Sequence, residues 1–247
     1  NLLEGNFGKY RIMTFGKKGE NIEVETNGIK IESSDCIRLF GVDIDNRLKF
    51  NEHVSNVSTK ASQRVGVLMR MRNMIPARAK LQLYKAAILP YLTYSHTIWH
   101  FCCASDKRKL ERVQERALRA VFNDKVAGYE ELLSKANLPS LQNRRLQDIA
   151  ILVYKAKHNL CPQHLSDLFT CKNIRFNLRN ADISIPRFNT VTYGKHSLRY
   201  LGAKIWSKLD AGVKSSATLE TFKARIRKIN IDFLMTENCR NCALCSN

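Results

Sequence analysis

The spacing of apolar positions along the chain changes near residue 46. Before this point, apolar and polar residues alternate in the stretches YRIMTFG (10–16), NIEVETNGIKIE (21–32) and CIRLFGVDI (36–44). A period of two is typical of half-buried strands, and Asn27-Gly28 is a strong signal for a two-residue hairpin turn. The first fifty residues therefore predict three short strands in one small antiparallel sheet.

After Asp45 the apolar positions recur every three or four residues, as on one face of an amphipathic helix. This period predicts helices at 54–72, 83–99 with a break at Pro90, 106–122, 196–210 and 217–234. The stretch YEELLSKANLPSLQNRR predicts a short helix, a turn at Pro139 and a further helix that is capped by Ser140 and runs to about Asn159. Residues 171–195 are rich in Asn and Arg without a regular period, so they predict a long loop with short strands.

These patterns together predict an α+β fold, with a small N-terminal antiparallel β-sheet followed by a mainly α-helical region. A chain of 247 residues can form one large domain or two small ones. The predicted division is listed from the N-terminus: a β-rich segment 1–50, a basic helical segment 51–127, a helical segment 128–235 and a Cys-rich tail 236–247.

Charge changes this picture, because the chain carries a formal net charge of +19. Residues 54–127 hold 14 basic and four acidic side chains, and residues 171–247 hold 14 and five. By contrast, residues 1–53 hold eight basic and nine acidic side chains. An excess of this size attracts polyanions, nucleic acid above all, although Lys and Arg can also serve only to solvate helix faces.

The longest uncharged run, AAILPYLTYSHTIWHFCCAS, covers residues 86–105. Its length would suffice for a membrane span, but it contains Pro90, two His, two Ser and two Thr. We therefore expect a buried helix pair or kinked helix, and no membrane partner. The chain has no secretory signal, so we expect an intracellular location, nuclear or cytoplasmic. Its start at Asn suggests a fragment or an incomplete gene model.

The stretch LFGVDID places Asp43 and Asp45 two residues apart on a predicted strand, so their side chains share one face. Two carboxylates in this arrangement are typical of two-metal phosphoryl-transfer sites. The favoured interpretation is structural, because Asp45 precedes NRLKF and can cap the turn into the next helix. Asp43 has no predicted role.

Several motifs resemble the reverse transcriptase of non-LTR (LINE-type) retrotransposons. NFGKYRIMTFGKK, NGIKI and LFGVDIDNRLKFNEHV are similar to the end of its palm, through Asn6, Lys9, Gly41, Val42, Ile44, Asp45, Leu48, Phe50 and His53. Phe40 stands where that pattern usually has Leu. LYKAAILPYLTYSHTIWHFC, KLERVQERALRAVF and YEELLSKANLPSLQNRRLQDI resemble the segments that follow, in the expected order and nearly to the end of the chain.

The resemblance implies that the chain holds the last palm strands, the thumb and the C-terminal helical region. The implied activity of the whole enzyme is Mg-dependent, RNA-directed DNA synthesis. Its metal-binding carboxylates would lie upstream, on a palm strand and in an aromatic-Ala-Asp-Asp turn, and this chain contains no Asp-Asp pair. We therefore expect no catalytic residue and no cofactor in this chain. The expected partners are an RNA/DNA primer-template and the upstream palm and fingers.

Two predicted helices supply the candidate nucleic-acid-binding residues. They are Lys60, Arg64, Arg70 and Arg72 on the first, and Arg108, Arg112, Arg116 and Arg119 on the second. Contacts from these side chains to phosphates would hold a duplex without reading its sequence.

The tail contains Cys239, Cys242 and Cys245, a spacing that can chelate Zn if a fourth ligand such as Cys171 completes the site. Free thiols are the alternative interpretation. For the chain as a whole, two other functions stay open: residual polymerase or nuclease activity, and a domesticated helical remnant that acts as a structural or protein-interaction module.

Overall fold

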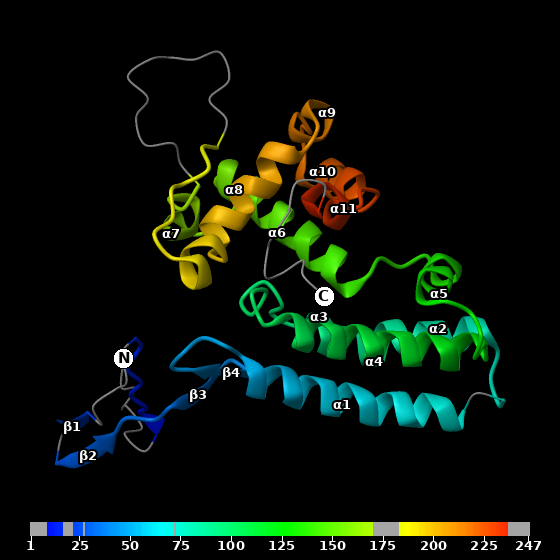
Figure 1. Cartoon of the computed structure of the whole chain (residues 1–247), viewed down its shortest axis with the longest axis horizontal. Coiled ribbons are helices and arrows are strands. Elements are labelled where there is room, and N and C mark those ends of the chain that lie inside the picture. The colour runs from blue at the N-terminus through cyan, green and yellow to red at the C-terminus, as the bar shows by residue number, and fades with distance from the viewer. Residues whose placement is uncertain (1–8, 17–21, 27, 72, 170–182, 237–247) are drawn as a thin grey trace, which may run out of the picture.

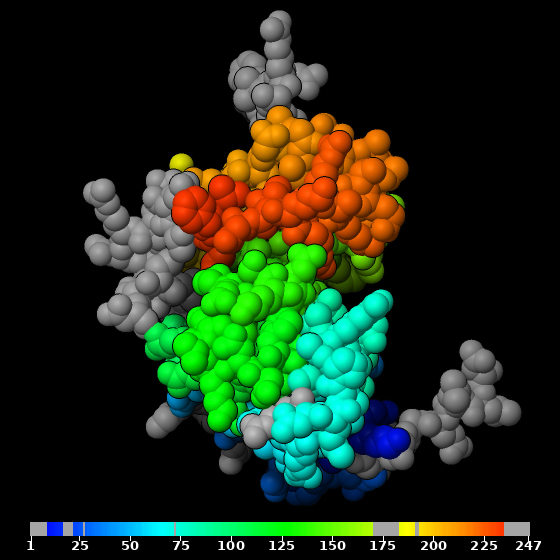
Figure 2. Space-filling view, turned by 90° about the vertical axis from the view of Figure 1, so that its right-hand side faces the viewer, coloured from blue at the N-terminus to red at the C-terminus, as the bar shows by residue number. Residues whose placement is uncertain are grey.

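The computed structural model describes residues 9–16, 22–26, 28–71, 73–169 and 183–236. Short strands come first and helices make up most of the rest, which confirms the predicted α+β class (Figure 1). The buried side chains form two hydrophobic clusters, from Val42 to Leu141 and from Leu146 to Ile231. Figure 2 shows the C-terminal helices, in orange and red, above the helices of the first cluster, in green and cyan. The predicted domain division stays a prediction.

The first hairpin joins β1 (Glu23–Thr26) to β2 (Ile29–Glu32) in antiparallel pairing. Gly28 has a φ of 73°, the left-handed conformation that glycine adopts easily, so the predicted turn is confirmed. The strand predicted at 10–16 is wrong: Ile12 forms only an isolated parallel bridge with Ser33. Because Val24 and Ile29 stay exposed, the hairpin offers little buried surface for another strand.

The stretch predicted as one strand at 36–44 folds back on itself. It forms β3 (Cys36–Leu39) and β4 (Val42–Asp45), in a second two-stranded sheet with Leu39 opposite Val42. Phe40 and Gly41 make the turn, with φ angles of 46° and 80°, as a type I′ hairpin requires. The expected single sheet is therefore two separate hairpins.

Figure 1 shows α1 (Asn51–Arg70) lying beside α4 (Ala104–Phe122), with both helices starting at the hairpin end of the molecule. The return path between them runs through α2 (Ala77–Leu83), η2 (Tyr84–Ile88) and α3 (Leu89–Thr93) without the predicted break at Pro90. A π-helical turn before Pro90 removes the clash that a proline ring makes inside an α-helix. The helix does not resume through Trp99, because residues 94–101 form turns.

Beyond α5 (Tyr129–Ala136) lies helix α6 (Leu141–Lys157), whose N-cap is Ser140. The Ser140 hydroxyl accepts from the Asn143 N–H at 3.1 Å, which confirms the predicted cap. The C-terminal cluster packs around α6. Its other elements are α7 (Gln163–Ser166), η3 (Val191–Lys195), α8 (Leu198–Lys208), α9 (Ala211–Lys214), α10 (Leu219–Ile226) and α11 (Ile231–Thr236).

The C-terminal region differs from the sequence prediction in two places. The helix predicted at 217–234 is two helices, because the chain turns at 227–230 and its carbonyls there accept hydrogen bonds from Asn143 and Gln147 of α6. Of the loop predicted at 171–195, the described part contains no strand and ends in η3. In the part of the chain that the structure describes, no helix has the length and hydropathy of a membrane span.

Candidate nucleic-acid interface

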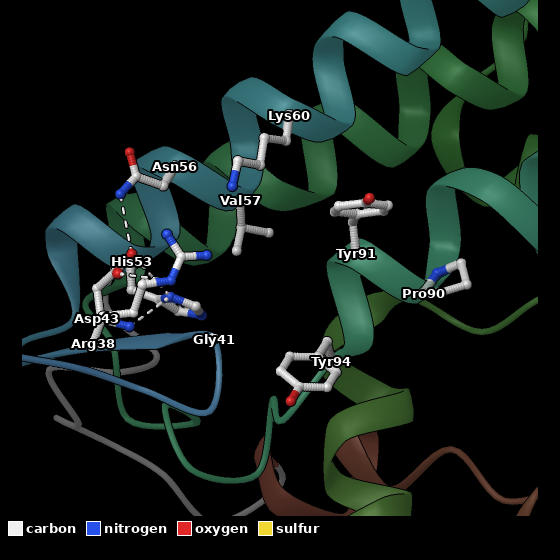
Figure 3. A pocket seen from close by; sticks show the side chains of 10 residues that line it. All are labelled: Arg38, Gly41, Asp43, His53, Asn56, Val57, Lys60, Pro90, Tyr91 and Tyr94. Atoms are coloured by element: carbon white, nitrogen blue, oxygen red, sulfur yellow. Dashed lines mark hydrogen bonds and ion pairs between the residues drawn. The ribbon is translucent and has the colours of Figure 1, made fainter. Parts of the chain in front are cut away.

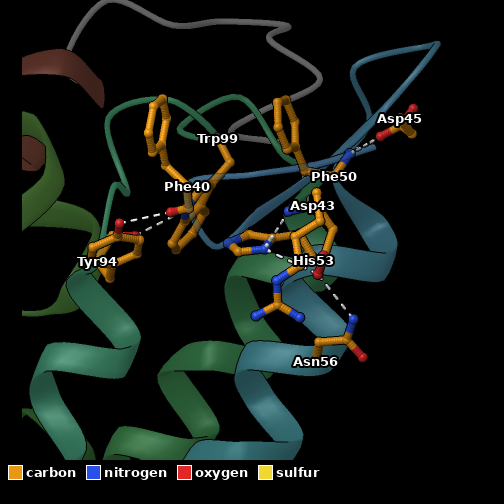
Figure 4. Close-up of polar contacts among 9 residues, drawn as sticks. Phe40, Asp43, Asp45, Phe50, His53, Asn56, Tyr94 and Trp99 are labelled. Atoms are coloured by element: carbon orange, nitrogen blue, oxygen red, sulfur yellow. Dashed lines mark hydrogen bonds and ion pairs between the residues drawn. The ribbon is translucent and has the colours of Figure 1, made fainter. Parts of the chain in front are cut away.

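Asp45 fixes the junction between β4 and α1. Its carboxylate accepts backbone N–H groups from Arg47 at 3.0 Å, Lys49 at 3.0 Å and Phe50 at 2.6 Å (Figure 4). This loop is strained, since Leu48 and Phe50 have φ angles of 53° and 60°. The predicted capping role of Asp45 is confirmed, and the direction in which α1 leaves the hairpin depends on it.

Asp43 points to α1 instead of joining Asp45 in a carboxylate pair (Figure 4). Its Oδ2 accepts from Asn56 Nδ2 at 3.0 Å and lies 3.6 Å from His53 Nδ1. The Asp43 backbone N–H donates to the same His53 nitrogen at 3.2 Å. Burial lowers the pKa of His53, so the ring is neutral and Nδ1 can accept. Asp43 therefore anchors the hairpin to α1.

A groove between α1 and α4 gathers basic side chains. Its walls are Ser58, Thr59, Ser62 and Gln63 from α1, and Lys109, Arg112, Val113 and Arg116 from α4. Arg112 and Arg116 are exposed, and no carboxylate of the described residues lies within ion-pair distance of either. Guanidinium groups beside hydroxyls and an amide are the donors that hold phosphate oxygens.

Lys60 and Arg64 lie on the other flank of α1, toward α3. The Arg64 guanidinium carbon sits 4.2 Å above the Tyr91 ring centre, and Arg64 Nη2 donates to the Tyr91 hydroxyl at 2.6 Å. Lys60 and Arg64 thus lie on one side of α1, and Arg112 and Arg116 lie on the other.

The remaining predicted residues differ in whether their side chains are exposed or are bound by other groups of the chain. Arg70 and Arg108 are exposed, in the last turn of α1 and the first turns of α4. Arg119 is engaged inside the chain, because it pairs with Glu115 at 2.7 Å and donates to the Lys125 carbonyl at 2.9 Å. Arg72 lies outside the described residues.

The motif LERVQ uses its other side chains to join helices. Glu111 accepts from the N–H groups of Leu141 at 3.2 Å and Gln142 at 2.8 Å, which are the first two residues of α6, and from the Tyr129 hydroxyl. Burial raises the pKa of Glu111, and these hydrogen bonds oppose that shift.

Gln114 adds further hydrogen bonds to this contact of α4 with α5 and the start of α6. It accepts from the Tyr84 hydroxyl at 2.7 Å and donates to Tyr129 at 3.0 Å and to the Pro139 carbonyl at 3.2 Å. The buried face of α4 is therefore structural, and its opposite face presents the arginines.

The histidines and cysteines of the described region do not form a metal centre, because no three His, Cys, Asp or Glu side chains there are placed to hold an ion. His96 is buried and lies 2.7 Å from an Asp148 oxygen, and burial lowers its pKa. Cys102 is buried, whereas Cys103 is exposed. The predicted zinc ligands, Cys239, Cys242 and Cys245, lie outside the described residues, as does Cys171.

Sequence reasoning missed two parts of this surface. The first is the wall of the groove that carries hydroxyl groups, which Ser58, Thr59 and Ser62 form. The spacing of these short polar side chains in the sequence is the signal that could have indicated it. The second missed part is the contact between Tyr91 and Arg64, because it forms only when α3 packs against α1.

Part of the chain is similar to curated polymerases of Drosophila melanogaster mobile elements. The probable RNA-directed DNA polymerase from transposon X-element is 25% identical over 96 residues, that from transposon BS 25% over 101, and that from mobile element jockey 26% over 102. The matches cover 38–40% of this chain and only 11% of each relative. No family model and no solved structure matches the chain. The similarity supports a relationship of this region to retrotransposon RNA-directed DNA polymerases.

Proposed function

We propose that this chain holds the sugar–phosphate backbone of an RNA/DNA primer-template, as the thumb and C-terminal region of a retrotransposon RNA-directed DNA polymerase. The groove between α1 and α4 carries the proposal, because Lys109, Arg112 and Arg116 converge there without carboxylate partners among the described residues. The similarity to mobile-element polymerases supports the choice of nucleic acid as the anion.

The chain binds through charge and shape, without reading bases. Arg112 and Arg116 bind phosphates from one side of α1, and Lys60 and Arg64 bind from the other. Arg70 and Arg108 extend the two groups, and Arg119 supports the α4 stripe through its pair with Glu115. Because each neutralised phosphate releases condensed counterions, affinity falls steeply as salt rises.

Catalysis belongs to residues that this sequence does not contain. The Mg²⁺-binding carboxylates of the whole enzyme come from the upstream palm, and this chain positions the duplex for them. A primer-extension assay with the 247-residue chain and Mg²⁺ is expected to give no product; extended primer would contradict this part of the proposal.

If the tail binds Zn²⁺ through Cys239, Cys242 and Cys245, it does so with a further ligand, and zinc-probe titration of the full chain tests this.

The binding proposal is tested by fluorescence anisotropy with an RNA–DNA hybrid across a salt series. The double variant Arg112→Gln/Arg116→Gln should lower the magnitude of the log K against log salt slope by roughly two units, since each neutralised phosphate accounts for about 0.9. The matched control, Lys204→Gln/Lys208→Gln on α8, removes the same charge elsewhere and should leave the slope unchanged. Absence of binding at about 50 mM salt, or equal changes in both variants, would contradict the proposal.

A further inference from the structure

A second hollow lies between the β3–β4 hairpin, α1 and α3 (Figure 3). Its volume of about 330 Å³ is at the lower end of the roughly 300–1,000 Å³ that small-ligand sites occupy. It is separate from the α1–α4 groove, because its walls come from the opposite flank of α1 and from the hairpin turn. The phosphate contacts proposed for Arg112 and Arg116 therefore do not involve this hollow, and of the residues that line it only Lys60 has been given a role above.

The walls of the hollow are apolar and aromatic. Val57 and Pro90 contribute aliphatic surface, and Tyr91 and Tyr94 contribute their rings (Figure 3). Both rings are held in place: Arg64 covers Tyr91, and the Tyr94 hydroxyl donates to the Phe40 carbonyl at 2.8 Å. Tyr94 is still 53% exposed, so its ring is available to a flat ligand.

The rim of the hollow is cationic. Lys60 projects from α1 with its amino group over Val57 (Figure 3), and no carboxylate of the described residues lies within ion-pair distance of it. Arg38 lies across from it, 60% exposed, with its Nε 3.8 Å from an Asp43 oxygen. Asp43 is the carboxylate that lines the hollow, and it also accepts from Asn56 and lies beside His53. An aromatic, apolar hollow under a positive rim complements a flat ring that carries a phosphate.

We propose that this hollow holds one unpaired nucleotide of the bound nucleic acid, with its base against Tyr94 and Val57 and its phosphate at Lys60 and Arg38. A paired base cannot enter, because its two faces are covered by its neighbours in the stack and its edge by its partner. The inference rests on the proposed nucleic-acid binding. It adds that single-stranded extensions of the duplex are bound as well as its backbone.

The test compares the full chain on two RNA–DNA hybrids, one blunt and one with a short single-stranded extension. We expect the extension to tighten binding by about tenfold, within the range of one base–aromatic stack. Val57→Phe fills the hollow and should abolish this gain without changing affinity for the blunt hybrid. Val67→Phe, at an exposed position of α1 outside the hollow, should leave both affinities unchanged.

The outcomes separate the two proposals. If neither hybrid binds, both fail. If both hybrids bind equally well and Val57→Phe changes neither affinity, the nucleotide site is refuted while backbone binding stands. A second measurement uses the unchanged chain: 5-iodouridine in the extension should cross-link on irradiation to Tyr91 or Tyr94. Cross-links confined to α4 would overturn the inference even if Val57→Phe failed to fold.

Discussion

Replacing Asp45 by Ala should destabilise the chain by about 2–4 kcal/mol. The substitution removes the acceptor of three backbone N–H groups, at 3.0, 3.0 and 2.6 Å. A hydrogen bond to a charged group contributes roughly 1.5–3 kcal/mol, and the two N–H groups nearer solvent recover part of that from water. The left-handed backbone conformations of Leu48 and Phe50 cost roughly 1–2 kcal/mol each. The hydrogen bonds of this carboxylate help to offset that cost.

Urea unfolding followed by circular dichroism measures the effect. Asp45→Asn keeps one acceptor oxygen and should fall between the wild-type chain and Asp45→Ala. Asp35→Ala is the control, since its carboxylate accepts an exposed hydrogen bond from Asn46 in the same loop, and it should change the unfolding free energy by less than about 1 kcal/mol. A stability of Asp45→Ala within about 0.5 kcal/mol of wild type would refute the argument that this carboxylate organises the junction.

Three further substitutions have outcomes that follow from single contacts. Gln114→Leu leaves the buried Tyr84 hydroxyl without its acceptor and should lower the unfolding free energy by about 2–3 kcal/mol; an unchanged midpoint would contradict this. Burial lowers the pKa of His53 below its ordinary 6.5, so its contribution to stability is present above pH 6.5 and is lost as pH falls through the folded-state pKa. His53→Asn should therefore flatten the pH dependence of the urea midpoint between about pH 5 and 7, and an identical slope would argue against it. Gly202→Ala places a methyl 2.7 Å from a phenyl carbon of Phe169 and should lower the free energy of unfolding by about 1–3 kcal/mol; an unchanged thermal midpoint would contradict this.

The long helices were predictable because each buries one stripe of apolar side chains. The period of 3.6 placed the first helix at 54–72, and the structure has it at Asn51–Arg70. The start is displaced because Phe50 is the N-cap with no side-chain hydrogen bond of its own, and Asp45, five residues earlier, supplies the acceptor. The sequence identified Asp45 as a cap of this turn, but it did not indicate that the carboxylate reaches the Phe50 N–H and so where the helix begins.

The β3–β4 hairpin was not predictable from local sequence. Phe40-Gly41 lacks the Asn or Asp that usually marks a type I′ turn, and a phenylalanine with φ of 46° is unfavourable. Its carbonyl is held by the hydroxyl of Tyr94, 54 positions away. The contact that stabilises the turn is thus tertiary, and only the folded chain contains it.

The candidate interface was predictable in part. Steps of four residues from Arg108 to Arg116 indicated an exposed stripe on one helix, and the structure leaves these side chains exposed on α4. The sequence did not indicate that α1 divides the predicted residues into two groups, because that depends on which flank of α1 packs against α4. The hollow beside Tyr91 and Tyr94 is likewise a product of packing between elements far apart in sequence.

The two faces of α4 allow stability and binding to be separated by experiment. Glu111 and Gln114 point to α5 and the start of α6, whereas Arg112 and Arg116 point to the groove. Because the arginines have no carboxylate partner among the described residues, their replacement by Gln should leave the urea midpoint nearly unchanged while the salt slope of binding falls. Variants of the buried face should instead lower the midpoint, with binding reduced only in proportion to unfolding. A groove variant that unfolded the chain would mean that these arginines stabilise the fold and do not mainly serve a ligand.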